Sequence, residues 1–380
     1  MTASFHLRGS ALVVALAASF ISGVSGADDS WKEPNAYQQR NLVSDGSIPA
    51  DYTDPNLVNP WGIAFNPFGF VWVADNHTGK ATLYNGNGMP QPLVVTIPPA
   101  SDGSGPSDPT GIVFNGSGDF VVTQGNSSGP ARFIFATESG TLAAWAPDVD
   151  ATNALLVMDN TASGAVYKGL AMAGNGTGFF LYATDFHNGR IDVFDSNFQP
   201  THLSGCFQDP NIPRGFAPFG IQNIQGNLYV TYAKQDADRH DDVAGRGFGF
   251  VNVFDADGNL LKRLISRGRL NSPWGLALAP TGFGRFSNKL LVGNFGNGLI
   301  NAYDITTGEW VGRLRRPGGG TLRIEGLWGL SFGNGVQHQR THTLFFTAGP
   351  SDESQGLYGR IDAAPSSHLD LVPERETEEE

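Results

Sequence analysis

The chain has 380 residues, 50 of them Gly, with 11% aromatic and only 16% charged residues, a composition typical of a turn-rich β protein rather than a helical or disordered chain. The formal net charge of −12 opposes binding to nucleic acids and acidic membrane surfaces, so we expect neither as a partner. The one cysteine, Cys206, excludes an intrachain disulfide; we expect it in an outer strand, buried or at a sheet edge.

Residues 1–27 have the features of a secretory signal peptide. Arg8 precedes the apolar run Ala11–Ile21, which is too short to cross a bilayer, and small residues follow it as a cleavage site. The alternative is a retained membrane anchor. We expect a secreted or periplasmic protein that has no membrane contact after cleavage.

A six-residue phrase with Gly in third place occurs six times. The first copy is Pro60-Trp61-Gly62-Ile63-Ala64-Phe65, and the six glycines are Gly62, Gly111, Gly169, Gly220, Gly275 and Gly329. Their spacing of 49 to 58 residues indicates a solenoid, a propeller or an array. We interpret each phrase as an inner strand, with Gly where a larger side chain would collide near a common axis.

Each repeat continues with further short strands separated by Gly-containing turns, for example Phe70–Ala74, Ile191–Phe194 and Leu261–Ile265. Four antiparallel strands repeated radially form a propeller blade, so the predicted fold is an all-β, six-bladed β-propeller over residues 38–363. In the second repeat, Phe120–Thr123 and Phe133–Ala136 compete as second strand. We favour the latter, because it aligns with Tyr182–Thr184 of the third repeat.

The sixth repeat contains only three strands. The segment Gln39–Val43 belongs to no other repeat, so we expect it to complete the last blade and to pair two otherwise exposed edges. Residues 364–380 are acidic and poor in apolar side chains, which predicts a disordered tail.

The phrases resemble the NHL-type six-bladed propellers, and most closely an uncharacterised group of secreted proteins built on that plan. The resemblance rests on Asn41–Asp45, Leu57–Gly62, Thr184–Arg190 and Ser272–Gly275, and it covers roughly Asn41 to Asp362. Related propellers include calcium-dependent lactonases, a zinc-dependent lyase and ligand-binding modules. The acid that the lactonases place before an early repeat glycine is missing here, and the histidine spacing departs from that of the lyase.

One end of a propeller collects the turns between second and third strands, and we call it the top face. The last residues of the second strands are expected there: Asp75, Glu138, Asp185, Tyr232, Asn294 and Ala348. The candidate metal ligands are Asp75, His77, Glu138, Asp185, His187 and Asn294, and their oxygen-rich set favours Ca²⁺ over Zn²⁺. His240 lies in a charged insertion, residues 234–242, on the same face. The alternative is that these residues cap their own turns.

The residues just before the repeat glycines vary and include several aromatics. With Tyr232 they give the candidate ligand-binding set Trp61, Lys168, Phe219, Tyr232, Trp274 and Trp328. The alternative is that the aromatics pack between blades. Two functions therefore stay open. The protein binds a small molecule or a protein at the channel mouth, or it is a metal-dependent hydrolase or lyase that acts at the same place. We expect it to be a monomer.

Overall fold

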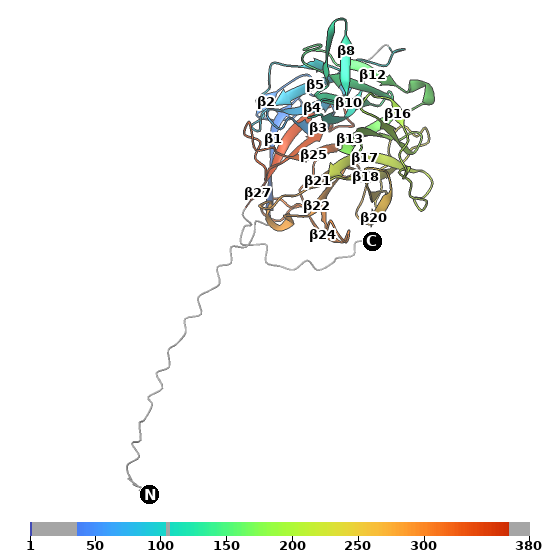
Figure 1. The fold of residues 1–380 in the computed structure, drawn as a ribbon. Helices are drawn as coiled ribbons and strands as arrows, with labels where there is room; N and C mark the ends of the chain where they lie inside the picture. Colours follow the sequence, from blue (N-terminus) through green and yellow to red (C-terminus); the bar gives the residue numbers. More distant parts are fainter. Residues whose placement is uncertain (2–35, 104–106, 365–380) are drawn as a thin grey trace. The chain divides into compact units, whose positions relative to one another are not determined.

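The computed structural model of the chain describes residue 1 and residues 36–103 and 107–364 (Figure 1). All but the first residue of the predicted signal peptide, and all but the first residue of the predicted acidic tail, lie outside these residues. No helix in the described part of the chain is long and apolar enough to cross a membrane.

Six of the sheets in the described chain are the blades of a propeller, and the inner strands gather near the centre of Figure 1. The first three blades are as follows, from inner to outer strand: blade one β3 (Pro60–Phe65), β4 (Val71–Asp75), β5 (Lys80–Tyr84), β6 (Val95–Thr96); blade two β7 (Pro109–Phe114), β10 (Phe133–Thr137), β11 (Thr141–Trp145), β12 (Leu155–Asp159); blade three β13 (Tyr167–Gly174), β14 (Phe179–Asp185), β15 (Arg190–Phe194), β16 (Pro200–Thr201).

The other three blades follow the same order: blade four β17 (Phe216–Ile224), β18 (Asn227–Lys234), β19 (Phe250–Phe254), β20 (Leu260–Ser266); blade five β21 (Pro273–Leu278), β22 (Leu290–Asn294), β23 (Ile300–Tyr303), β24 (Trp310–Arg313); blade six β25 (Leu327–Phe332), β26 (Leu344–Ala348), β27 (Leu357–Ala364), with β1 (Ala36–Ser44) and β2 (Tyr52–Thr53) beyond it. Three 3₁₀ turns lie between strands: η1 (Asn76–Thr78), η2 (Thr161–Ser163) and η3 (Gly284–Phe286). The predicted six-bladed, all-β fold is confirmed.

The repeat glycines lie where neighbouring inner strands meet. A Cβ atom on Gly220 would lie 2.2 Å from the carbonyl oxygen of Trp274 in the next blade. A Cβ atom on Gly329 of blade six would lie 2.6 Å from the carbonyl oxygen of Trp61 in blade one, so the crowding runs around the whole ring. Glycine is therefore required at these positions for close approach, as the repeat predicts.

Threonine hydroxyls also join neighbouring blades near the axis. Thr184 Oγ1 of β14 donates to the carbonyl oxygen of Phe219 at 2.7 Å, and Thr347 Oγ1 of β26 donates to that of Trp61 at 2.5 Å. Farther out, aromatic rings fill the wedges between blades: Trp72 of blade one stacks on Phe133 of blade two, 4.0 Å between centroids. The core is thus a ring of inter-blade contacts, with an axial cavity of only about 30 Å³.

Strand β1 pairs antiparallel with β27 from Ala36 opposite Ala364 to Ser44 opposite Leu357, and it contains the predicted segment Gln39–Val43. The hydroxyl of Tyr37 in β1 also donates to the carbonyl oxygen of Phe283 in blade five at 3.0 Å. That this strand holds the ring closed remains a prediction.

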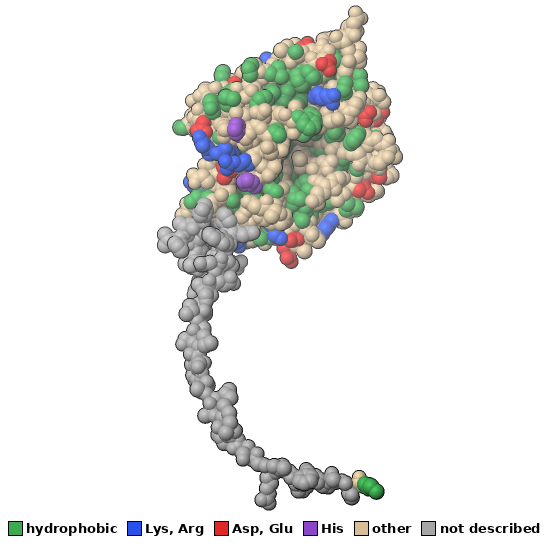
Figure 2. All heavy atoms as spheres, turned by 60° about the vertical axis from the view of Figure 1, so that its left-hand side comes forward, with side chains coloured by type: hydrophobic (Ala, Val, Ile, Leu, Met, Phe, Trp, Pro, Cys, Tyr) green, Lys and Arg blue, Asp and Glu red, His purple; other side chains and the backbone are tan. Residues whose placement is uncertain are grey.

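The second repeat contains an extra hairpin. The preferred second strand is confirmed as β10, and the competing segment starts a separate pair, β8 (Val121–Gln124) with β9 (Ser127–Pro130). This hairpin projects at the top of Figure 1, and Figure 2 shows a narrow tip, coloured tan, at the top of the molecule.

The expected position of Cys206 is wrong. The outer strand of blade three ends at Thr201, and Cys206 lies beyond it in a turn, where it is exposed and has a left-handed backbone.

Candidate ligand site at the mouth of the channel

An aromatic cluster closes the channel below the top face. Trp61 stacks on Trp328 with 3.5 Å between ring centroids, and Phe295 stacks on the same ring of Trp328 at 3.9 Å. Trp274 and Phe219 meet Trp328 edge-on. Trp61, Phe219 and Trp328 are buried, and Trp274 and Phe295 are partly buried, so the packed rings form a rigid floor for the groups above them.

A chain of hydrogen bonds connects residues from blades six, one and two across this floor. The indole N–H of Trp328 donates to Asn59 Oδ1 at 3.0 Å, and because an indole only donates, this bond fixes the orientation of the Asn59 amide. Asn59 Nδ2 then donates to Asn76 Oδ1 at 3.2 Å, and Asn76 Nδ2 donates to Glu138 Oε2 at 2.8 Å. The amides thus direct their donors toward the carboxylate of Glu138.

Lys168 extends the network to the remaining blades. Its side chain is only 1% exposed; the ammonium group donates to Glu138 Oε1 and, at 2.9 Å, to Asp241 Oδ1 in the β18–β19 loop of blade four. The carbonyl oxygen of Lys168 accepts from the indole of Trp274 in blade five at 2.8 Å. Every blade therefore contributes a residue to one hydrogen-bonded network at the mouth.

The charge of Lys168 is stable despite its burial. Desolvation lowers the pKa of the ammonium, but the attraction of Glu138 and Asp241 outweighs it and holds the pKa above its usual range. The lysine also lies 5.3 Å from the centroid of the Trp61 ring. The charged ammonium of Lys168 therefore lies between the carboxylates of Glu138 and Asp241.

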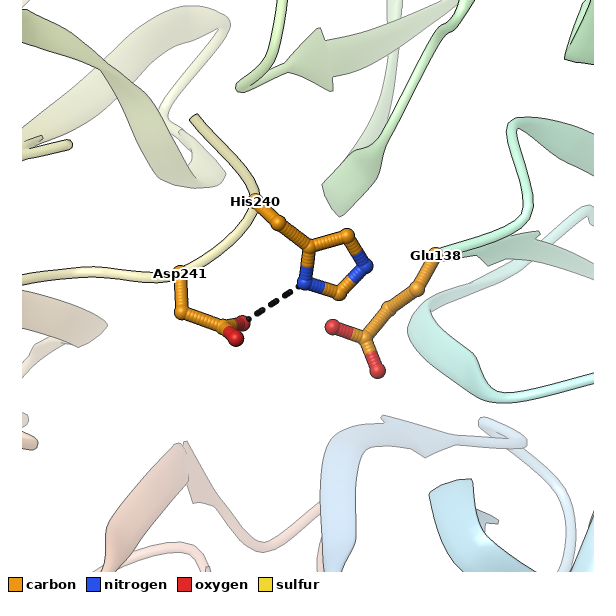
Figure 3. A group of neighbouring side chains, drawn as sticks. All are labelled: Glu138, His240 and Asp241. Carbon is orange, nitrogen blue, oxygen red and sulfur yellow. Dashed lines mark hydrogen bonds and ion pairs between the residues drawn. The ribbon is translucent and has the colours of Figure 1, made fainter. Parts of the chain in front are cut away.

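Glu138, His240 and Asp241 form a compact group, in which the ligand atoms lie within 4.8 Å of one another. Figure 3 shows the imidazole between the two carboxylates, with its Nδ1 3.0 Å from Asp241 Oδ1. This hydrogen bond raises the pKa of His240 and lowers that of Asp241. Both residues are about half exposed or more, so the group is open to solvent.

Glu353 reaches the network from the β26–β27 turn of blade six. Its Oε2 accepts from Asn59 Nδ2 at 2.6 Å. Burial raises the pKa of its carboxyl to about 7, while the hydrogen bond from Asn59 opposes the rise. The group therefore titrates near neutral pH.

The turn that carries Glu353 has an unusual backbone. Ser351, Asp352 and Glu353 all have left-handed φ angles, of 55°, 50° and 64°. Each such residue costs roughly 1–2 kcal/mol in an L-amino-acid chain. Strain of this kind concentrates at functional sites, which makes Glu353 a residue of interest.

Two further acids at the mouth have raised pKa values. Burial, with the nearby charge of Glu138, raises the pKa of Asp108 to about 6, and burial raises that of Asp242 to about 6. The mouth thus combines one fully paired lysine with carboxyl groups that change charge between about pH 6 and 7.

Two proteins of Acanthamoeba polyphaga mimivirus are similar to this chain over most of its length. Protein R648 is 37% identical over 328 residues, which are 84% of this chain and 78% of R648. Protein L690 is 35% identical over 327 residues, 84% of both chains. The chain belongs to the family of these two viral proteins.

Both of these viral proteins are named only as uncharacterized proteins, so neither supplies an activity. No protein-family model matches the chain, and its resemblance to NHL propellers stays a prediction. Among solved structures, a glucose dehydrogenase is similar with a TM-score of 0.54 at 12% identity, covering 86% of this chain and 99% of the dehydrogenase. At this identity the likeness shows the fold alone.

In this R648-family propeller, the predicted metal ligands do not gather at one point, and only Glu138 belongs to the group in Figure 3. Asp185 accepts from the backbone N–H of Asn188 and from its Nδ2, which is the turn-capping arrangement. Asn294 Nδ2 donates to the carbonyl oxygen of Arg269, in the loop before blade five.

The remaining predicted ligands lie apart from the group in Figure 3. Asp75 is fully buried, and desolvation raises the pKa of its carboxyl well above the usual range. His77 approaches Asn59 Nδ2 at 3.3 Å, and His187 lies beside Gly164.

The predicted ligand-binding residues divide into two groups. Trp61, Phe219, Trp274 and Trp328 form the floor, and three of them are 2% exposed or less. Lys168 lies in the polar network above that floor. Tyr232 is buried in the core between blades three and four. As the structure stands, the rings pack against one another and offer little free surface.

Asn59, Asn76, Asp108, Asp241 and Glu353 are missing from the sequence-based site. Two of these residues, Asn59 and Asp108, share a sequence feature, because each directly precedes the proline that begins a repeat phrase. Asn59, Asp108 and Ser272 each precede a repeat Pro and have left-handed φ angles of 47° to 48°. The residue before proline rarely adopts such a conformation, so extending the repeat by one position exposes a strained position at the mouth.

Proposed function

We propose that this protein binds a small, donor-rich ligand at the mouth of its channel. The observation that carries the proposal is the single hydrogen-bonded network to which all six blades contribute, above a buried aromatic floor. The carboxylate of Asp241 is 65% exposed and that of Glu138 is 14% exposed, and carboxylate oxygens accept hydrogen bonds from hydroxyl or amine groups. Small polyols and amines are therefore the favoured ligand classes.

A thermal-shift screen of neutral polyols, amines and carboxylic acids tests this proposal. The wild-type protein is compared with Asp241→Asn and with the control Asp238→Asn, which changes an exposed acid in the same loop. Polyols or amines should stabilise the wild type and the control but not Asp241→Asn. If carboxylic acids are the better ligands, or if the two variants respond alike, the site is assigned wrongly.

A divalent-metal function is the second candidate, because Glu138, His240 and Asp241 can supply one ligand atom each. Lys168 opposes it. At an effective dielectric constant of 20, a divalent ion about 4 Å from the ammonium meets a repulsion of roughly 8 kcal/mol. A metal-dependent hydrolase or lyase would therefore need Lys168 to move away from the carboxylates.

Metal analysis of the purified protein separates the two candidates. We expect no thermal shift of the wild type with Ca²⁺, Mn²⁺ or Zn²⁺, and a shift with at least one of them in Lys168→Met, whose carboxylates are released. A stoichiometric metal in the wild type would favour the enzyme. Lys262→Met, which alters a lysine on the outer strand of blade four, is the matched control.

We also propose that the chain is exported and acts as a monomer. Support for export comes from the short apolar run after Arg8 and from the following small residues. Detection of the mature chain, beginning near residue 28, outside the cytoplasm of an expressing cell would test it.

A further inference from the structure

A second hollow of about 490 Å³ lies on the flank of blade three, apart from the residues of the mouth network. This volume lies within the range of small-molecule pockets. Its lining is rich in apolar side chains, among them Ile191, Val193, Leu203 and Phe207, and it includes Cys206.

The hollow exists because the outer strand of blade three is short. Strand β16 has two residues and pairs only with Val193 and Phe194, so the outer edge of β15 is uncovered from Arg190 to Asp192. In blade four, by contrast, β20 pairs along β19 from Phe250 to Phe254. The space that a longer fourth strand would fill is therefore left open.

The opposite wall is anchored to blade four. The backbone N–H of Gly205 donates to the carbonyl oxygen of Asp257 at 2.9 Å, and that of Phe207 donates to the carbonyl oxygen of Gly258 at 3.0 Å. A Cβ on Gly205 would lie 2.1 Å from the backbone nitrogen of Asn259, so the two segments are in close contact.

This anchored wall also has a strained backbone. Cys206 and Phe207 have left-handed φ angles of 57° and 51°. Such a conformation persists only where its surroundings fix it. The wall is accordingly preformed, rather than shaped by a ligand.

The charges at the hollow are balanced internally. Arg190 Nε donates to Asp192 Oδ1 at 2.7 Å, and the hydroxyl of Tyr167 donates to Asp192 Oδ2 at 2.9 Å. The opposite charges of Arg190 and Asp192 offset each other, so this pair gives a charged ligand little net attraction. The polar side chains of Asn160, Ser163 and Gln208 also line the hollow and can bond to a neutral polar edge.

We propose that this flank hollow is a second binding site, for an uncharged molecule with an aromatic or alicyclic body and one polar edge. It is independent of the function proposed for the mouth. Apolar surface from Ile191, Val193 and Leu203 supplies the driving force, and the neutral rim sets the preference for uncharged ligands.

Because Cys206 is the one cysteine in the chain, its thiol reports on the hollow without mutation. The probe is N-phenyl-1-naphthylamine, an uncharged aromatic amine whose fluorescence rises in apolar surroundings. We expect a saturable rise at one equivalent. At saturation, the reaction of Cys206 with a disulfide reagent should slow at least tenfold.

Two variants locate the binding. Leu203→Gln should weaken probe binding at least tenfold, while Leu261→Gln, an exposed leucine on the outer strand of blade four, should leave it unchanged. Equal melting temperatures establish that Leu203→Gln is folded. Fluorescence that does not saturate, or a Cys206 that the probe does not protect in the wild type, would overturn the proposal whatever the two variants show.

Discussion

Burial decides the protonation of single acids in this propeller, and Asp75 is the clearest case. It was a candidate metal ligand because it ends the second strand of blade one, but its side chain lies in the core and carries a strongly raised pKa. A neutral carboxyl is a poor metal ligand. The repeat pattern correctly places Asp75 at the end of a strand, but it does not reveal that the side chain there is buried away from water.

Asp75→Asn should stabilise the protein at pH 8 on the order of 1–3 kcal/mol. The folded protein holds a proton on Asp75 that the unfolded chain releases above its ordinary pKa, so stability falls as the pH rises; asparagine removes this cost. Urea unfolding at pH 5 and pH 8 measures the effect, with exposed Asp102→Asn as the control. A variant less stable than the wild type at pH 8 would contradict this assignment.

Glu353→Gln should reduce the pH dependence of stability. Its pKa in the fold is about 7, raised by burial, so the glutamate contributes a loss of stability as pH rises from about 4.5 to 7. Allowing for partial exposure, the loss is on the order of 2 kcal/mol. Melting temperatures at pH 5 and pH 8 should differ less in Glu353→Gln than in the wild type, and an unchanged difference would show that Glu353 titrates normally.

Among the elements, the inner strands were the most predictable and the turns of the top face the least. The Gly phrase marks every inner strand, because the same steric demand recurs in each blade. Glu138 and Lys168 were both candidates, but in separate sets, since no local pattern reveals that a side chain of β13 meets the turn after β10. Asp241 and Glu353 lie in irregular turns whose backbone no repeat specifies.

Gly220→Ala should destabilise the fold by about 2–4 kcal/mol, because its Cβ would meet the Trp274 carbonyl oxygen at 2.2 Å. Gly118→Ala is the matched control, since nothing lies within 4 Å of its Cβ position and its φ angle is not in the left-handed range. Denaturant unfolding of both variants checks the claim. Equal stabilities would mean that the inner strands can separate at little cost.

For the whole molecule, the question is how a ring without disulfides stays closed. Strand β1 pairs with the outer edge of blade six, and Tyr37 reaches from it to blade five, where its ring lies 4.9 Å from that of Phe283. The overall architecture was predictable because the period, the strand count and the unpaired N-terminal segment agree. The polar network was not, because it depends on how six different turns meet.

Tyr37→Ala should destabilise the protein by about 3–5 kcal/mol, the usual cost of removing a fully buried aromatic side chain. Deleting residues 28–45 should lower the melting temperature further, because the edge of β27 then loses its partner strand. Tyr52→Ala, which changes a 39% exposed tyrosine in β2, is the control for the point variant. A deletion that melts at the wild-type temperature would rule out a role for β1 in ring closure.

Calorimetric titration of the best polyol or amine ligand, in two buffers of different ionisation enthalpy at pH 7, tests the central claim most directly. Since His240 and Glu353 have perturbed pKa values at the mouth, a ligand bound there should exchange protons with the buffer, so the two apparent enthalpies should differ. In Asp241→Asn the affinity should fall at least tenfold, or about 1.4 kcal/mol. Buffer-independent binding that Asp241→Asn leaves intact would place the ligand elsewhere and contradict the account.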